Sequence, residues 1–363
     1  MQIGVARETR EGEARVAMTP DTVQRLAGKG FHVLVEHGAG SRADYSDEAY
    51  LQAGAEIGDR AAAYDSDILV KVRRPAETDV AAMRPGGVFI GQMESCGDDE
   101  LLAEMLAKEM RVLVMERMPR ISRAQSMDVL SSQSNIAGYR AVIEAAAHYG
   151  RFMPMLMTSA GSVKPARLVV LGAGVAGLQA IATARRLGAD VYAYDVRAET
   201  NEQIRSLGAK PIELDLGEDA AGSGGYAKEL SEEAKARQQA ALADELAKAH
   251  IIITTALIPC RPAPTLITEE VVQRMRAGSV IVDLAAANGG NCTLTEADQV
   301  IERHGVTLVG HTNLPSLLAA DASAFFARNL FNLLEIMVDR SDAGPVLKDL
   351  SADEVTQAML ASQ

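Results

Sequence analysis

Residues 167–195, RLVVLGAGVAGLQAIATARRLGADVYAYD, constrain the fold more than any other part of this chain. A run of β-forming apolar residues leads directly into Gly172, Gly174 and Gly177, a helical pattern follows, and Asp195 ends a second apolar run. In such a strand–turn–helix the first glycine permits the tight turn. The second lets a diphosphate approach the backbone, and the third lets helix and strand pack closely. We therefore predict a dinucleotide-binding turn, with a glycine turn that binds no ligand as the alternative.

The acid at the end of the second run favours NAD(H) over NADP(H). The carboxylate of Asp195 can accept hydrogen bonds from the adenosine ribose and would repel a 2′-phosphate. Arg197 is the opposing feature, because an arginine there can bind a phosphate. Since the acid ends the strand and the arginine lies beyond it, we predict NAD(H). The cofactor-binding residues predicted here are Gly172, Gly174, Val175, Ala176, Gly177, Asp195, Val196 and Arg197.

Short β-rich runs alternate with longer Ala- and Leu-rich segments along most of the chain, which indicates parallel sheets covered on both faces. The chain has 363 residues, enough for two domains. We predict an α/β fold of two doubly wound, Rossmann-like domains with a nucleotide cleft between them. Residues 131–318 would form the NAD(H)-binding domain, and residues 1–130 with 319–363 a discontinuous first domain. Strands are expected at residues 2–7, 32–37, 68–73, 88–93, 111–116, 167–171, 190–194, 210–214, 250–255, 279–284 and 306–310, and helices at 20–29, 99–110, 135–150 and 316–337.

Ligands of such sheets lie beyond the carboxyl ends of the strands. Ala256, Leu257 and Asn313 follow two of the later strands, so we predict that they line the nucleotide site. Asp283 and His311 also end strands, but a turn-capping carboxylate and a hydrogen-bonded loop histidine are the simpler interpretations. Residues 120–134 are polar and predicted as a loop, and the glycine-rich residues 216–226 as a mobile one.

Charge and composition exclude several classes of function. The formal net charge is −13, and an acidic chain repels nucleic acid and anionic lipid. The N-terminus carries charges where a signal peptide needs an apolar run, which predicts a cytoplasmic protein. The three cysteines, Cys96, Cys260 and Cys292, match no metal-ligand spacing, so no metal site is predicted.

Several blocks of the sequence together resemble the NAD(H)-binding domain I of the proton-translocating nicotinamide nucleotide transhydrogenases. They are IGVARETREGEARVAMTP, PRISRAQSMDVLSSQSNIAGYRA, GAGVAGLQAIATARRLGA, GGYAKEL, TTALIPCRPAP, VIVDLAAANGGNC and GHTNLPS. The resemblance covers nearly the entire chain. The RAQSMD and GGYAKE loops are specific to this group, whereas the glycine turn is not.

The resemblance implies which residues contact the nicotinamide end of the nucleotide. Arg120, Gln125, Asp128 and Ser131 would position the nicotinamide without acid or base chemistry, and Ile121, Ser122 and Arg123 belong to the same binding loop. Gly225 and Tyr226 match the family's mobile loop, whose tyrosine covers the bound nucleotide. For Arg120, Gln125, Asp128 and Ser131 the alternative is a solvated polar loop, and for Tyr226 it is a flexible surface loop that does not contact the nucleotide.

The same resemblance implies an activity, Re/Si-specific NAD(P)⁺ transhydrogenation, that needs other chains. The cofactor of this chain would be NAD(H). NADP(H) would bind a partner subunit, and protons would cross a separate membrane-spanning subunit. The expected assembly contains a homodimer of this chain, held on the cytoplasmic side of the inner membrane through its partners.

The chain also resembles the alanine dehydrogenases, which share both domains and the opening block and give the main alternative function. Enzymes of that family use a catalytic lysine, a histidine and an aspartate, whose positions correspond here to Arg73, Met93 and Ala287; only the substrate-binding arginine remains, as Arg15. These replacements remove the groups that move protons in amine–ketone chemistry. A third possibility is a non-catalytic module that senses NAD(H).

Overall fold

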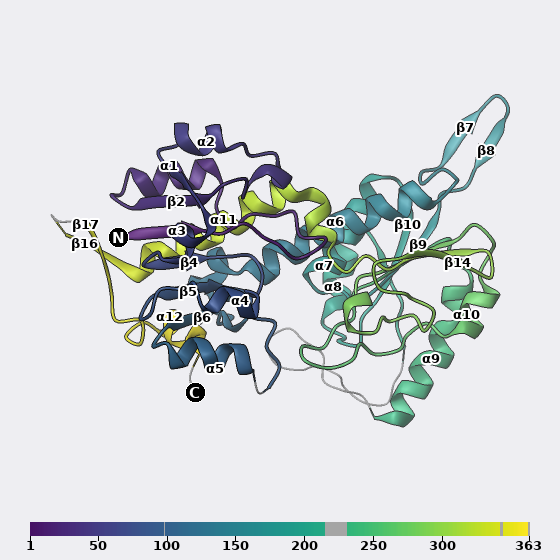
Figure 1. Ribbon diagram of the computed structural model, residues 1–363. Coiled ribbons are helices and arrows are strands. Elements are labelled where there is room, and N and C mark those ends of the chain that lie inside the picture. The colour runs from purple at the N-terminus through teal and green to yellow at the C-terminus, as the bar shows by residue number, and fades with distance from the viewer. Residues whose placement is uncertain (98, 215–230, 342–343, 362–363) are drawn as a thin grey trace. The chain divides into compact units, whose positions relative to one another are not determined.

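The computed structural model describes residues 1–97, 99–214, 231–341 and 344–361. The chain forms two compact units, Met1–Gln133 with Pro315–Gln363, and Ser134–Leu314. Each unit contains a large sheet of wholly or mainly parallel strands with helices on both faces, which confirms the predicted α/β class (Figure 1).

The first unit contains a six-stranded parallel sheet in the order β3-β2-β1-β4-β5-β6. The order reverses between β1 and β4, and in open α/β sheets the ligand crevice lies at such a reversal. The five predicted strands form and end one to three residues earlier than predicted. β3 was not predicted, because it holds a single apolar residue, Ile57. The strands are β1 Gln2–Val5, β2 His32–Glu36, β3 Glu56–Gly58, β4 Ile68–Val70, β5 Val88–Gly91 and β6 Arg111–Val114.

Alternate strand residues of this sheet enter two different cores. Ile68 and Val70 pack in a cluster with Phe326 of α11, whereas Leu69 packs on the opposite face with Leu102 of α5. Burial on both faces explains why the strands consist of apolar residues without alternation. The helices of this unit are α1 Pro20–Ala27, α2 Asp47–Gln52, α3 Arg60–Tyr64, α4 Glu77–Val80, α5 Glu100–Ala107, α11 Ala319–Met337 and α12 Glu354–Met359, and a hairpin joins β16 Val338–Ser341 to β17 Gly344–Leu347.

The second unit contains a seven-stranded sheet in the order β11-β10-β9-β12-β13-β15-β14. β9 and β10 have the predicted bounds. β14 was not predicted and runs antiparallel to β15 at the edge. β11 is shorter than predicted and contains only Lys210 and Pro211, after which the backbone N–H of Ile212 still donates to the carbonyl of Ala193 at 2.7 Å. The strands are β9 Arg167–Leu171, β10 Asp190–Tyr194, β11 Lys210–Pro211, β12 Ile251–Thr254, β13 Val280–Asp283, β14 Val300–Arg303 and β15 Val306–Val309; the helices are α7 Val175–Arg186, α8 Thr200–Ser206, α9 Glu232–Ala247 and α10 Glu269–Arg274.

The prediction of a loop over residues 120–134 is wrong. A 3₁₀ helix, η3 Ser122–Met127, occupies its centre, and α6 Val129–His148 begins six residues before the predicted helix. Asp128 explains the early start. Its carboxylate accepts the backbone N–H of Ser131 at 3.0 Å, which satisfies a donor of the first turn. The serines that follow Asp128 are typical of loops, but with this capping bond they are compatible with the start of the helix.

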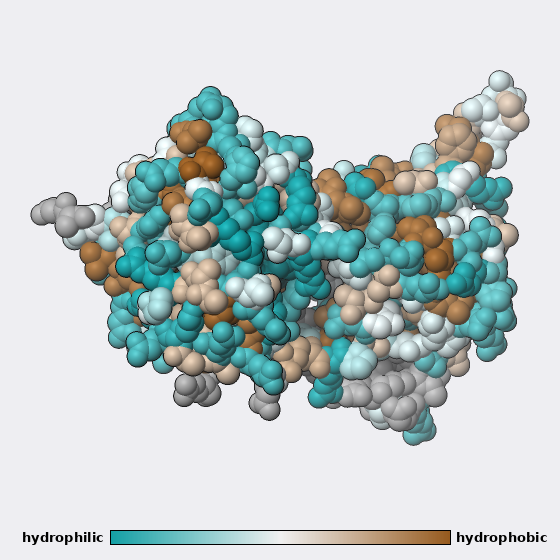
Figure 2. Space-filling view, in the orientation of Figure 1, coloured by the Kyte–Doolittle hydropathy of each residue, from teal (hydrophilic) through white to brown (hydrophobic). Residues whose placement is uncertain are grey.

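A two-stranded hairpin, β7 Leu156–Thr158 and β8 Gly161–Val163, projects from the second unit (Figure 1). Met157 of β7 is 76% exposed and Met155, just before it, 63%, and Figure 2 shows hydrophobic surface at the base of the hairpin. Among the residues that the structure describes, no helix combines the length and the apolar character needed to cross a bilayer.

Candidate nucleotide-binding site

The glycine turn follows β9, where the order of the second sheet reverses between β9 and β12. Gly172 has a φ of +99°, in the left-handed region that favours glycine, and a Cβ there would lie 2.4 Å from the Thr255 hydroxyl oxygen. A Cβ on Gly177 would lie 1.8 Å from the carbonyl oxygen of Gly172. Both positions therefore require glycine for the packing of the turn itself.

Gly174 differs from the other two glycines. Its φ is −78°, which any residue can adopt, and a Cβ there would meet no atom of the described residues within 4 Å. Packing within the described part of the chain therefore does not require glycine at this position, whereas a ligand that approaches the backbone would. Gly174 is also the N-cap of the 12-residue helix α7, whose first residues are Val175 and Ala176. A helix N-terminus offers N–H groups and partial positive charge to an anion.

Asp195 follows β10 and is almost fully engaged within the chain. Its Oδ2 accepts the backbone N–H of Ala173 at 2.7 Å and Nη2 of Arg197 at 2.8 Å. Its Oδ1 accepts the backbone N–H and Nε of Arg197, both at 2.9 Å. Burial alone would raise the pKa of Asp195, but the hydrogen bonds and charge of Arg197 lower it, so the group stays ionised. Arg197, considered above as a phosphate ligand, pairs with this acid, and Val196 lies between them.

The later strand ends supply Ala256, Leu257 and Asn313. Asn291, which is completely buried, holds Ala256 through both backbone groups: its Oδ1 accepts the N–H at 3.2 Å and its Nδ2 donates to the carbonyl at 2.8 Å. Leu257 is 37% exposed, and Asn313 is half-buried after β15. Asn291 was not predicted from the sequence, because a buried asparagine in a loop carries no motif.

Asp283 and His311, the other two strand-end residues, have partners within the second unit. The Asp283 carboxylate accepts the Thr254 hydroxyl at 2.8 Å and the backbone N–H of Cys292 at 3.0 Å. It also accepts the Thr295 hydroxyl and the N–H of Ala285. Its bonds therefore hold the surrounding loops, as the simpler interpretation predicts. The Nε2 of His311 lies 3.8 Å from the carboxylate of Glu144.

In the first unit, Asp128 and Ser131 lie together. The Ser131 hydroxyl donates to the Asp128 carboxylate at 2.5 Å, and both side chains are half-buried. Arg120, Ser122 and Gln125 are exposed, and Ile121 is half-buried. Arg123 instead forms an ion pair with Asp353, the N-cap of α12. Gly225 and Tyr226 lie outside the described residues.

A charged cluster surrounds Arg15, which is 3% exposed. The Nε and Nη2 of Arg15 donate to the two carboxylate oxygens of Glu13 at 2.7 and 2.6 Å, and its Nη1 donates to Oε1 of Gln133 at 2.8 Å. Arg73 also donates to Glu13, at 2.8 Å, and forms an ion pair with Glu94. Burial would raise the pKa of Glu13, but Arg15 and Arg73 bring it down to about 2. The Nε and Nη2 donors of Arg15 are therefore already bound to a carboxylate of the chain itself.

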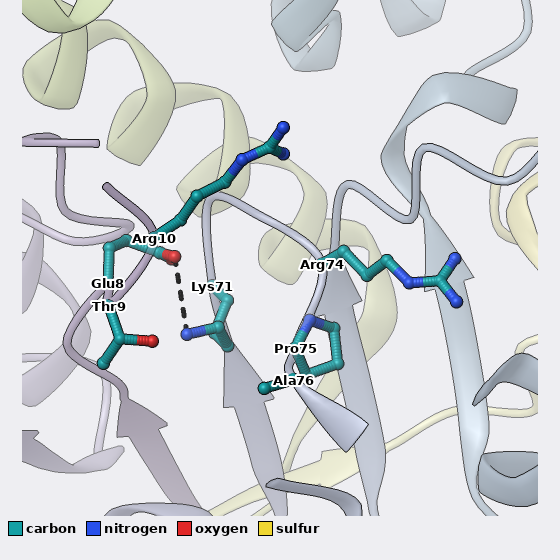
Figure 3. A pocket seen from close by; sticks show the side chains of 7 residues that line it. All are labelled: Glu8, Thr9, Arg10, Lys71, Arg74, Pro75 and Ala76. Carbon is teal, nitrogen blue, oxygen red and sulfur yellow. Dashed lines mark ion pairs between the residues drawn. The ribbon is translucent and has the colours of Figure 1, made fainter. Parts of the chain in front are cut away.

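A small cavity of about 280 Å³ lies at the β1/β4 reversal of the first sheet (Figure 3). The buried ammonium of Lys71 lies 3.4 Å from the Glu8 carboxylate there, and Thr9, Pro75 and Ala76 contribute to the wall. The guanidinium groups of Arg10 and Arg74 point away from Lys71 in Figure 3 and pair with Glu94 and Asp99. Because these cations are already paired, the cavity offers little net charge to a ligand.

Comparison with protein families matches residues 4–137 to the alanine dehydrogenase/PNT N-terminal domain and residues 141–362 to the alanine dehydrogenase/PNT C-terminal domain. The chain belongs to the alanine dehydrogenase/PNT family. Among curated proteins, it is 50% identical to the first part of the NAD(P) transhydrogenase alpha subunit of Rhodospirillum rubrum, covering 96% of this chain and 93% of the relative. It is 48% identical to NAD(P) transhydrogenase subunit alpha of Haemophilus influenzae, covering 94% of this chain and 67% of that longer relative.

Alanine dehydrogenases are more distant members. The Bacillus subtilis alanine dehydrogenase is 31% identical over 87% of this chain and 80% of its own length. Among solved structures, a transhydrogenase from Sinorhizobium meliloti superposes with a TM-score of 0.88 at 45% identity, covering 99% of this chain and 98% of the other. An L-alanine dehydrogenase gives a TM-score of 0.81 at 25% identity, with 100% and 95% coverage. These comparisons confirm the resemblance to transhydrogenases.

Proposed function

We propose that this chain is the NAD(H)-binding subunit of a proton-translocating transhydrogenase. When bound, NADH supplies a hydride that passes directly to NADP⁺ held by a partner subunit. Transfer between two nicotinamide rings requires the rings to be held in contact and needs no general acid or base at the carbon centres. The chain's own contribution is therefore to bind and orient one nucleotide.

Residues of the second unit would hold the diphosphate and the adenosine. The open backbone at Gly174 and the N-terminus of α7 fit a diphosphate in shape and charge. The ionised Asp195 fits the ribose hydroxyls, provided that they share or replace the hydrogen bonds that Arg197 now donates. Its negative charge disfavours a 2′-phosphate, which supports NAD(H) as the cofactor of this chain. Ala256, Leu257 and Asn313 would complete the binding site.

Residues of the first unit would position the nicotinamide. The Asp128–Ser131 pair presents acceptor oxygens to a carboxamide N–H₂. Arg120 and Gln125 have exposed side chains that can reach the nicotinamide end or the partner's nucleotide. Ile121, Ser122 and Arg123 belong to the same segment at the start of η3, and the ion pair of Arg123 with Asp353 anchors it to α12. Gly225 and Tyr226 are proposed to cover the bound nucleotide.

The observation that carries this proposal is the chemistry of Arg73, Met93 and Ala287, which by resemblance correspond to the proton-moving groups of alanine dehydrogenases. Arg73 is paired with two carboxylates, Met93 is completely buried, and Ala287 has no functional group. Burial alone would raise the pKa of the adjacent Glu94, but the charges and hydrogen bonds of Arg73 and Arg10 outweigh burial and lower the pKa. This carboxylate therefore stays ionised and cannot donate a proton near neutral pH. These residues therefore supply no group that moves a proton near neutral pH, which supports hydride transfer without acid or base chemistry.

The proposed assembly contains more than this chain. The transhydrogenase relatives from Rhodospirillum rubrum and Haemophilus influenzae are named as alpha subunits, or parts of them, which implies further subunits. We expect a homodimer of this chain, an NADP(H)-binding subunit and a membrane-spanning subunit that carries the protons. This chain would then lie on the cytoplasmic side of the inner membrane.

The test combines the purified chain with an NADP(H)-binding transhydrogenase domain. NADH should reduce an NAD⁺ analogue only when NADP(H) is bound to that domain, and the chain alone should leave NADH unchanged with pyruvate and ammonium. NADH oxidation by the chain alone with those substrates would instead establish an alanine dehydrogenase. Tight NADH binding with no transfer in any combination would establish a non-catalytic sensing module.

A further inference from the structure

Asn329 of α11 is buried and uses both ends of its amide on one short segment of the chain. Its side chain is 8% exposed. Its Nδ2 donates to the carbonyl oxygen of Ser126 at 2.8 Å, and its Oδ1 accepts the Ser132 hydroxyl at 2.7 Å. A buried amide whose donor and acceptor are both satisfied by fixed partners holds those partners at a defined separation.

The two partners of Asn329 bracket the Asp128–Ser131 pair. Ser126 lies near the end of η3 and Ser132 in the first turn of α6, so the amide closes a short arch of chain, residues 126–132. A second contact lies next to this arch, where Nε2 of Gln133 donates to the carbonyl of Ala322 on α11 at 3.0 Å. These contacts fix the position of the arch relative to α11. The position of the arch in turn sets where the Asp128 and Ser131 side chains lie.

We propose that Asn329 is a positioning residue for the nicotinamide end of the bound nucleotide. It acts through the arch and touches neither the nucleotide nor the reacting atoms. This inference rests on the proposed function, because it gives Asp128 and Ser131 the role assigned above. Without the amide the Ser126 carbonyl loses one of its two side-chain donors, and the Ser132 hydroxyl loses its acceptor on α11. The arch can then shift away from α11.

A displaced arch has a consequence that general destabilisation would not reproduce. The proposed adenosine contacts, Asp195 and the glycine turn, belong to the second unit, whereas Asn329 belongs to the first. Asn329→Ala should therefore weaken binding of NADH and leave binding of AMP, which lacks the nicotinamide, unchanged. We expect the NADH dissociation constant to rise about tenfold, equivalent to about 1.4 kcal/mol, with the AMP constant within about twofold of that of the unmodified chain.

Three further variants complete the experiment. Asn332, which donates to the same Ser126 carbonyl at 2.9 Å, does not bridge to Ser132, so Asn332→Ala should have a smaller effect. Arg328→Ala changes an exposed side chain of α11 and serves as the control that leaves both constants unchanged. Ser132→Ala breaks the other end of the bridge without altering α11, so it tests the arch even if Asn329→Ala fails to fold. NADH binding is measured by its own fluorescence, against a chain without tryptophan, and AMP binding by calorimetry.

The outcomes separate this inference from the proposed function. Selective loss of NADH binding in Asn329→Ala and Ser132→Ala supports the positioning role. Unchanged NADH binding in both, or equal loss of NADH and AMP binding, overturns it. Asp128→Ala and Ser131→Ala test the site itself: if they leave NADH binding unchanged, the proposed placement of the nicotinamide fails. If they weaken it while the two bridge variants do not, only the role of Asn329 fails.

Discussion

Two glycines of one turn should respond in opposite ways to the same substitution. For Gly174→Ala, the added methyl meets no described atom and the φ of −78° is acceptable. Alanine at a compatible glycine position gains about 0.4–1 kcal/mol of stability through the unfolded chain. As an N-cap it is worse than glycine by a similar amount, about 0.5–1 kcal/mol. The two effects offset, so we expect stability to change by less than about 1 kcal/mol.

Gly177→Ala places the same methyl 1.8 Å from the Gly172 carbonyl oxygen, where Cβ contacts under 3.0 Å essentially never occur. Helix α7 must then move away from β9, and overpacking of this kind costs about 1–3 kcal/mol or more. Gly174→Ala should melt close to the unmodified chain and bind NADH at least about tenfold more weakly, since the methyl occupies the proposed approach of the diphosphate. Gly177→Ala should melt well below it.

Melting followed by circular dichroism, and NADH titration followed by nucleotide fluorescence, measure the two effects separately. If Gly174→Ala binds NADH within about twofold of the unmodified chain, the diphosphate does not approach this backbone. If the variant instead melts as low as Gly177→Ala, the position is needed for packing, and the assignment of a ligand role to it is wrong.

Two further substitutions, one of them with a control variant, probe the charged groups. Glu13 has a pKa of about 2 in the fold against an ordinary 4.5, so its ionised form contributes about 3 kcal/mol of stability above pH 4.5 that is lost as the pH falls toward 2. Glu13→Gln should lower the free energy of unfolding at pH 7 by about that amount and make it depend less on pH below 4.5. Glu11→Gln changes an exposed neighbour and should do neither. Equal urea midpoints for the two variants at pH 7 would contradict this. Asp195→Ala removes the proposed ribose acceptor and the charge that repels a 2′-phosphate. The ratio of NADPH to NADH dissociation constants should therefore fall about tenfold, and an unchanged ratio would exclude Asp195 from cofactor selection.

The sequence predicts those parts of the fold that depend on local pattern. β9, the glycine turn, α7 and β10 form a continuous stretch whose signals lie within thirty residues, and β9 and β10 have the predicted bounds. The start of α6 was misplaced because the serines after Asp128 are typical of loops, and the capping bond that starts the helix there is a matter of geometry. β14 is exposed along most of its length at a sheet edge, so its apolar signal is weak.

In the site, too, local motifs can be predicted from the sequence, whereas contacts between distant residues cannot. Gly174, Asp195 and the Asp128–Ser131 pair are predicted from motif or resemblance, and the structure shows the contacts that hold Asp195, Asp128 and Ser131. The supporting contacts join residues far apart in the chain: Asn329 reaches Ser126 across 203 positions. Asn291 reaches Ala256 across 35. A single sequence gives no signal for such pairs, because neither member belongs to a periodic pattern.

The central claim is that this chain orients a nucleotide for direct hydride transfer and contributes no titrating group to the reaction. NADH carrying deuterium on the transferred position of the nicotinamide, mixed with this chain and an NADP(H)-binding partner domain loaded with NADP⁺, tests that claim most directly. We predict that the label is recovered in the NADPH formed, with no hydrogen from water at that carbon and a rate independent of added pyruvate or ammonium. NADPH that carries hydrogen from the solvent, or NADH oxidation that requires pyruvate and ammonium, would contradict it.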